Sequence, residues 1–168
     1  RQGMWSAVAI SLPIWAILWQ TEPLLVLLGQ EPRLAAEAAT YMHALQWSVL
    51  PFLFYIVIRA LISAMERPLA GLWVGLAAIC LNALVGWTLI FGHFGFPRLG
   101  LVGAGVATVI SSSVLFGGLS LYLVFDRKFR RYHFFGRFWR ADWPRFRHVW
   151  RLGLPIGLTL AFEVTVFN

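Results

Sequence analysis

The sequence predicts an all-α protein, a polytopic bundle of transmembrane helices. Hydrophobic residues make up 60% of the 168 positions and charged residues only 12%, whereas soluble domains carry about 45–50% and about 25%. The mean hydropathy is +0.73. The apolar residues fall in runs of about 20, the length that crosses the hydrocarbon core as a helix. The alternating segments of about ten residues that membrane strands require are absent.

Short polar turns and one long basic segment divide the chain. The first residue is Arg1, and the last apolar run stops at Asn168 without a polar flank, so we expect the chain to be part of a longer protein. We predict a first unit over 1–126 with helical spans at about 4–28, 38–62, 69–91 and 100–125, a basic linker over 127–151, and the start of another span over 152–168.

The distribution of positive charge predicts the orientation of the spans. Nine of the 14 Lys and Arg residues lie in 127–151, and positive loops stay in the cytoplasm. Only Arg33 and Arg98 then fall on the outer side. Aromatic residues alternate with arginine in this linker, which in a soluble protein would suggest nucleic acid. Between two membrane spans, a surface segment in contact with anionic lipid headgroups explains it better, with a helix starting at 142–144.

Glu163 is the strongest candidate for a functional residue, because it lies in the middle of the last apolar run. An ionised carboxylate at mid-helix costs about 2.5–3.5 kcal/mol. Protonating an ordinary glutamate at pH 7 costs about 3.7 kcal/mol. The two costs are similar, so we expect this carboxylate to exchange a proton or to bind a cation. The alternative is a structural pair with another helix.

Several other residues inside the spans could contribute to a site. Asn82 and Thr108 are polar groups within apolar runs, and they could either bond between helices or line a cavity. Pro13, Pro51 and Pro155 each interrupt a span. A proline frees a backbone carbonyl and bends the helix, and bent helices often line the cavities of transporters.

No residue pattern predicts an enzyme. The sequence has no metal-ligand spacing, no phosphate-binding glycine loop, and no nucleophile paired with a base. The single cysteine, Cys80, lies in an apolar run and reads as a packing residue. The four histidines are scattered, and we expect His43 to serve in helix packing rather than as a ligand.

Five pieces of the chain together resemble the multidrug and toxic compound extrusion (MATE) family of antiporters. Their order and spacing carry the resemblance. They are Leu28-Gly29-Gln30, the stretch from Arg59 to Pro68, Leu81-Asn82 with Leu89 to Gly92, Gly100 to Thr108, and Leu152 to Gly157 followed by Phe162-Glu163.

The resemblance implies a fold and a set of site residues. Members of the family have twelve helices in two six-helix lobes, and this chain would cover about helices three to seven, with 127–151 connecting the lobes. Glu163 matches a cation-binding acidic residue of the seventh helix. Asn82 and Thr108 match two positions of a polar cluster in the first lobe. That cluster often has Asp or Asn where this chain has Gly86, which favours a second-lobe site.

The implied function is secondary active export of cationic amphipathic drugs or metabolites in exchange for Na+ or H+. No cofactor besides the coupling ion is expected, and we expect a monomer in the bacterial inner membrane when the protein is full length. Two alternatives remain. One is a lipid-linked oligosaccharide flippase of the same superfamily, which would need several cationic residues facing the cavity. The other is a membrane scaffold that does not transport, for which Glu163 would be dispensable.

Overall fold

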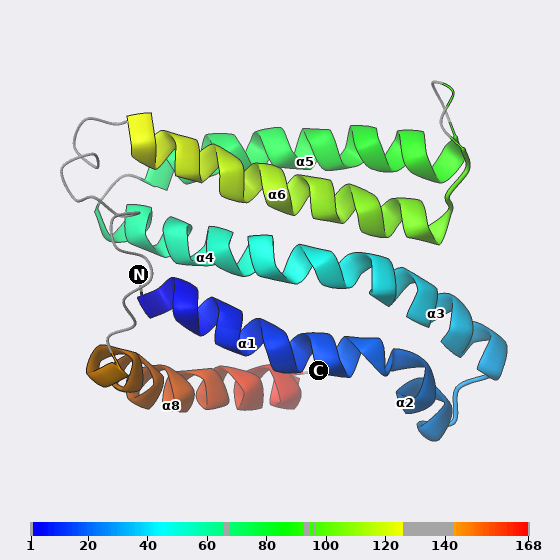
Figure 1. The fold of residues 1–168 in the computed structure, drawn as a ribbon, viewed down its shortest axis with the longest axis horizontal. Coiled ribbons are helices and arrows are strands. Elements are labelled where there is room, and N and C mark those ends of the chain that lie inside the picture. Colours follow the sequence, from blue (N-terminus) through cyan, green and yellow to red (C-terminus); the bar gives the residue numbers. More distant parts are fainter. Residues whose placement is uncertain (1, 66–67, 93–94, 96, 126–142, 168) are drawn as a thin grey trace.

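The computed structural model describes residues 2–65, 68–92, 95, 97–125 and 143–167, and every regular element among them is a helix. The long helices lie side by side along one axis (Figure 1). In chain order the elements are α1 (Gln2–Trp19), α2 (Thr21–Leu27), α3 (Pro32–Leu45), the 3₁₀ turn η1 (Gln46–Ser48), α4 (Val49–Ala64), α5 (Pro68–Phe91), α6 (Leu101–Phe125) and α8 (Trp143–Phe167).

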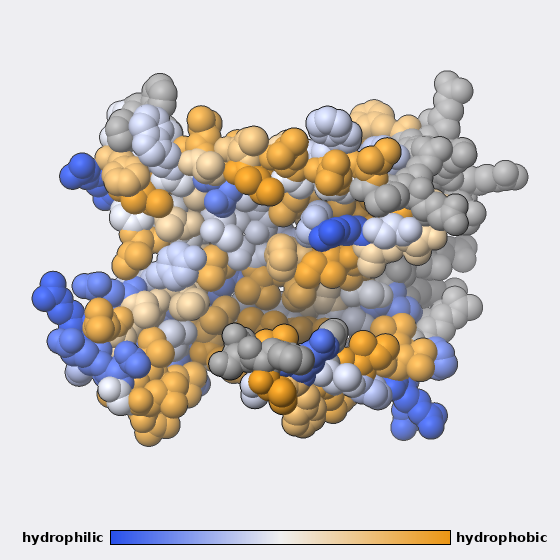
Figure 2. Space-filling model, turned by 180° about the vertical axis from the view of Figure 1, so that it is seen from behind, coloured by the Kyte–Doolittle hydropathy of each residue, from blue (hydrophilic) through white to orange (hydrophobic). Residues whose placement is uncertain are grey.

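The described part of the chain contains five helical stretches long and apolar enough to cross a membrane, with α3 and α4 counted as one stretch. Large apolar side chains such as Leu121 and Phe125 are exposed on the outside of the bundle. Figure 2 shows hydrophobic residues over most of one face, with hydrophilic residues mainly at its two ends. The chain is therefore a multi-pass membrane protein, and the predicted all-α fold class is confirmed.

Helix α6 is the centre of the bundle and packs against α3, α4 and α5. Its first turns approach their neighbours so closely that only glycine fits. A Cβ atom added at Gly105 would lie 2.6 Å from the Cβ of Ala44, and one added at Gly103 would lie 2.8 Å from the carbonyl oxygen of Leu89. Close backbone approach of this kind is how small residues hold helices together in lipid.

The far half of α6 makes the other main contact of the bundle. Leu119 and Leu123 are buried there against Tyr55, Ile58 and Ile62 of α4. These five side chains form the apolar core. Helix α6 is thus fixed at both ends, by glycine contacts at one and by branched side chains at the other.

The span predicted at 4–28 is divided in the structure. Helix α1 ends at Trp19, and the short α2 begins at Thr21. Pro23 lies in the first turn of α2 and has no N–H to offer the Trp19 carbonyl, four residues earlier. His43 Nε2 lies 3.3 Å from that oxygen, and its ring stacks on the Trp19 indole with centroids 5.7 Å apart. His43 therefore packs helices together, as expected.

The span predicted at 38–62 starts earlier and is also divided. Helix α3 begins at Pro32, a favourable first position because proline has no N–H to lose. The 3₁₀ turn η1 then separates α3 from α4. Pro51, in the first turn of α4, cannot bond the Trp47 carbonyl, which lies in this turn. The sequence marked Pro51 as an interruption, and the tighter turn lies just before it.

Helix α8 differs from the predicted division between linker and span. It begins at Trp143, which agrees with the predicted helix start, and continues without a break to Phe167. The rings of Phe146 and Trp150, one turn apart, lie with centroids 5.9 Å apart. Nothing in the backbone marks a boundary at 151–152, because no glycine or proline falls there. The rest of the predicted linker, including Asp142, lies outside the described residues.

We expect Gly105→Ala to destabilise the protein by about 1–3 kcal/mol, because the new methyl group would overlap Ala44 and force α3 away from α6. Thermal unfolding of the intact protein in detergent would measure the effect.

Gly117→Ala is the matched control on the same helix, since a Cβ atom there would have no neighbour within 4 Å. Alanine also favours a helix by about 1 kcal/mol over glycine. This variant should be as stable as the wild type or more so. Equal loss in both variants would contradict the close α3–α6 contact.

Candidate functional site

Glu163 is exposed, like the other residues of α8 from Arg151 to Thr159 and from Phe162 to Val166. Helical geometry places it about 180° around the axis from Leu154, which lies toward α1, and about 16 Å along the axis from Leu152. The apolar part of α8 begins near Leu152, so this distance is about half of the ~30 Å hydrocarbon core. If the membrane span begins near Leu152, as the sequence predicts, the carboxylate would lie near mid-membrane depth, and this depth remains a prediction.

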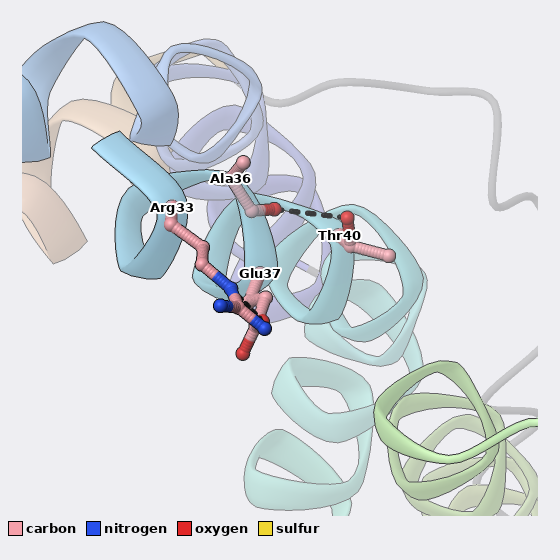
Figure 3. Close-up of polar contacts among 4 residues, drawn as sticks. All are labelled: Arg33, Ala36, Glu37 and Thr40. Atoms are coloured by element: carbon pink, nitrogen blue, oxygen red, sulfur yellow. Dashed lines mark hydrogen bonds and ion pairs between the residues drawn. The ribbon is translucent and has the colours of Figure 1, made fainter. Parts of the chain in front are cut away.

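Glu163 has no ion-pair partner within the described part of the chain, and Glu37 provides a contrast. Glu37 lies one turn after Arg33 on α3, and its Oε1 is 3.6 Å from the Arg33 Nε (Figure 3). Both of these side chains are well exposed, so this pair contributes little to stability. Glu37 is thus paired, whereas Glu163 has no such partner among the described residues.

A cleft of about 770 Å³ lies between α4, α5 and α6. Each helix contributes one face to it, with residues spaced three or four apart as helical geometry requires. The lining residues are Ser48 from η1, Phe52, Tyr55, Ile56 and Arg59 from α4, Gly75, Ala78, Ile79, Asn82 and Ala83 from α5, and Thr108, Ser111, Ser112 and Leu115 from α6. The structure thus brings Asn82 and Thr108 together in one site.

The hydroxyl groups of α6 in this cleft bond to their own helix. Thr108 Oγ1 donates to the Ala104 carbonyl at 3.0 Å, and Ser111 Oγ donates to the Ala107 carbonyl at 2.9 Å. Their hydrogens are used, but each oxygen keeps lone pairs that can accept a hydrogen bond or bind a cation. The Asn82 amide has no hydrogen-bond partner among the described residues. The cleft wall is therefore mostly apolar, with a few polar groups that can still accept a hydrogen bond.

Arg59 is the residue of this cleft that the sequence analysis did not assign to a site. It is the only charged side chain among the described lining residues. The sequence placed it near the inner end of its span and counted it with the inner positive charges. Its register with Phe52 and Tyr55, at intervals of seven and four residues, is the signal that could have placed it on the cleft face.

Glu163 does not line this cleft, and the predicted site residues therefore fall into two groups. The prolines are also separate from each other. Pro13 and Pro155 lie inside α1 and α8, each of which continues as a single helix, and Pro51 follows η1. Bending at Pro13 and Pro155 remains a prediction. In the described part of the chain no three His, Cys, Asp or Glu side chains gather as a metal site would require.

The turn at η1, which contributes Ser48 to the cleft, is held from α1. The indole Nε1 of Trp15 donates to the Gln46 carbonyl at 2.7 Å, and the Trp15 and Trp47 rings lie with centroids 5.6 Å apart. The same carbonyl also accepts the backbone N–H of Val49. Gln46 is buried, so this shared oxygen links α1 to the start of α4 inside the bundle.

We expect Trp15→Phe to lower the free energy of unfolding by about 0.5–1.5 kcal/mol, because the ring is kept while the hydrogen bond to Gln46 is lost. Thermal unfolding in detergent would measure the loss. Trp73→Phe is the control, since Trp73 is exposed on α5. A loss of similar size in both variants would show that the indole N–H of Trp15 contributes nothing specific.

Comparison with known proteins places the chain in a family. The MatE family model matches residues 1–88. The chain is 54% identical over 99% of its length to the "Probable multidrug resistance protein NorM" of Brucella suis and 52% identical over its whole length to the protein of the same name in Mesorhizobium japonicum. The "Multidrug resistance protein NorM" of Vibrio parahaemolyticus is 33% identical over 99% of the chain.

The chain spans 36% of the length of the Brucella and Mesorhizobium relatives. No solved structure gives a significant match. The family model covers more than half of the chain, and the similarity to these relatives extends over the segments that the model does not cover. The chain belongs to the MatE family, the multidrug and toxic compound extrusion proteins.

Proposed function

We propose that the full-length protein exports cationic amphipathic compounds in exchange for Na+ or H+, with Glu163 as the coupling group. The observation that carries this proposal is the placement of Glu163. It is an exposed carboxylate within the apolar part of α8, it lies on the opposite side of the helix from Leu154, and it has no ion-pair partner among the described residues. The relatives are named multidrug resistance proteins, which supports export of small molecules.

The proposed cycle depends on competition at this carboxylate. A bound cation or proton neutralises Glu163, and release of that ion restores its negative charge. A cationic compound is then attracted to the same region, because an unpaired carboxylate in a low dielectric is costly. If the ion and the compound favour opposite-facing states, entry of the ion drives export of the compound by alternating access.

In this proposal the cleft between α4, α5 and α6 contributes polar contacts and does not bind the coupling cation. Asn82 and Thr108 offer hydrogen-bonding atoms there, but the charge on Arg59 opposes a cation in the same cleft. Gly86, where related proteins often carry Asp or Asn, adds no carboxylate. The coupling cation therefore belongs with Glu163, and Asn82 with Thr108 serve as secondary polar contacts.

Arg59 also bears on the flippase alternative. A lipid-linked pyrophosphate carries several negative charges, and one arginine in the described cleft provides only one of the cationic partners that such a headgroup needs. Multidrug export remains the better-supported proposal.

The setting in the membrane completes the proposal. The protein would act as a monomer in the bacterial inner membrane, with 127–151 in the cytoplasm against anionic headgroups. Within this segment the structure describes the backbone of 143–151, and Arg147 and Arg151 are both exposed there. Exposed arginines beside an apolar helix are typical of contact with an anionic membrane surface.

We expect Glu163→Gln to abolish ion-driven transport, because glutamine keeps the size of the side chain but can neither ionise nor release a proton. The measurement is ethidium movement in vesicles that contain the full-length protein, under an imposed Na+ gradient and then a pH gradient. The gradient that drives transport in the wild type identifies the coupling ion.

Glu37→Gln is the matched control, since it removes a carboxylate that is exposed and paired with Arg33. It should transport like the wild type. Unchanged transport by Glu163→Gln would show that the coupling site lies elsewhere. A folded wild-type protein that moves ethidium under neither gradient would count against multidrug export itself.

We expect Thr108→Val to raise the KM for a transported compound about 2- to 12-fold, the equivalent of one hydrogen bond, with the driving ion unchanged. Valine keeps the shape of the side chain and removes only the hydroxyl group. Thr88→Val is the matched control, because Thr88 Oγ1 also bonds its own helix, at 2.8 Å, but does not line the cleft. Equal KM values for the two variants would remove Thr108 from the site.

A further inference from the structure

A narrow groove of about 360 Å³ runs between α1 and α8. Ser6 and Ile10 form its α1 side, and Gly153 and Gly157 lie on its α8 side. A Cβ atom added at either glycine would have no neighbour within 4 Å, so the space beside both is open. Most of the remaining lining is aliphatic, which suits a hydrocarbon chain.

The groove continues into a shallow basic hollow at the start of α8. Trp150, Leu154 and Leu158 line both spaces, and Arg147, His148 and Arg151 line the hollow alone. Neither arginine forms an ion pair among the described residues. The joined site is therefore positively charged at one end and apolar at the other.

Two polar atoms in this site are buried without a partner. They are the Oγ of Ser6, a residue that is 9% exposed, and the Nε1 of Trp150. Buried polar groups are nearly always hydrogen-bonded, and those left unpaired are costly. Both atoms are hydrogen-bond donors, and none of the described residues accepts a hydrogen bond from them.

The dimensions match one lipid in one leaflet. The lining of α8 extends from Arg147 to Leu158, about 16 Å along the helix. Arg147 to Arg151 takes up about 6 Å of this length at the headgroup level, and the apolar part from Leu152 to Leu158 covers about 9 Å, which lies within the ~15 Å of one leaflet. Trp150 lies between the charged and apolar ends, where tryptophan is commonly found at the membrane interface.

We propose that the groove between α1 and α8 binds one anionic phospholipid. Its phosphate lies at Arg147 and Arg151, its ester oxygens accept hydrogen bonds from Ser6 and Trp150, and one acyl chain lies along Gly153 and Gly157. A discrete site of this kind goes beyond general attraction of the linker to a charged membrane surface. It depends on the two helices and not on the transport reaction.

Native mass spectrometry of the delipidated full-length protein tests the proposal, with phosphatidylglycerol and phosphatidylcholine of equal chain length added in turn. We expect one phosphatidylglycerol to bind with roughly 25-fold preference, about fivefold for each of the two arginines. The double variant Arg147→Gln/Arg151→Gln should lose the preference, since each arginine near a lipid surface contributes about fivefold. Gly157→Leu should lose bound lipid of both kinds, because leucine fills the acyl part of the groove.

Two controls separate lipid binding from damage to the fold. Arg33→Gln removes an exposed arginine from another helix, and Gly117→Leu adds a side chain at a glycine whose Cβ position is open, outside the groove. Both should bind like the wild type, and all four variants should unfold at similar temperatures. If the double variant is unstable, Arg147→Gln alone gives the same test, because the residue is exposed. This single variant should lower the preference for phosphatidylglycerol about fivefold.

Three results would overturn the proposal. One is equal binding of the two lipids by the wild type. Another is binding of many lipids without a preferred single one, which would indicate only diffuse attraction. The third is normal binding by both Gly157→Leu and the double arginine variant, which would show that other parts of the protein cover the groove. Because transport is not the readout, failure here leaves the export proposal standing.

Discussion

The close approach of α6 to its neighbours is the constraint on which the rest of the bundle depends. Lipid offers no hydrophobic drive for helices to associate, so contact must come from packing. Gly103 and Gly105 supply it at one end of α6, and Leu119 and Leu123 supply it at the other. Between these two regions α6 presents Thr108 and the serines that follow it.

This arrangement explains where the cleft lies. The middle of α6 carries short polar side chains that bond to their own backbone, so they neither reach the neighbouring helices nor fill the space between them. The cleft opens at this level because both ends of α6 are tightly held. Small residues of α6 therefore have two effects: the glycines near its start allow close packing, and the hydroxyl residues in its middle leave space for a ligand.

Much of this architecture was predictable from the sequence, since the length of the apolar runs decides how many helices cross a membrane. The break between α1 and α2 was not predicted, and the interruption expected at Pro51 appears as a 3₁₀ turn just before it. Pro23 and Pro51 were visible, but the structure also needs partners for the freed backbone, such as His43 beside the Trp19 carbonyl. These partners come from other helices, so local sequence does not reveal them.

The candidate site residues could be predicted from the sequence only in part. A glutamate in the middle of an apolar run is conspicuous in any sequence, and this isolated Glu163. Pairing Asn82 with Thr108 in one cleft required the antiparallel register of α5 and α6, which the resemblance supplied and the spans alone did not. Arg59 was missed because its position near the end of a span suggested a surface charge, whereas the register of α4 turns it toward the cleft.

Helix α8 combines two requirements of the proposed transport cycle. Glu163 lies on one side of it, and Gly153 and Gly157 lie on the side toward α1 with little side-chain contact. Pro155 lies between these glycines and leaves the Arg151 carbonyl without its helical partner. A helix with few packed side chains and a weakened backbone can shift at low cost.

Neutralising Glu163 can move such a helix. A change in ionisation at mid-membrane depth alters the free energy of its environment by about 2.5–3.5 kcal/mol. This is enough to change the ratio of two conformations by roughly two orders of magnitude. The glycine-lined face then has to accommodate the movement without losing contact with α1. A hydrocarbon chain in the groove can do so, because it fills the space at any small displacement, whereas interlocking side chains would resist the movement.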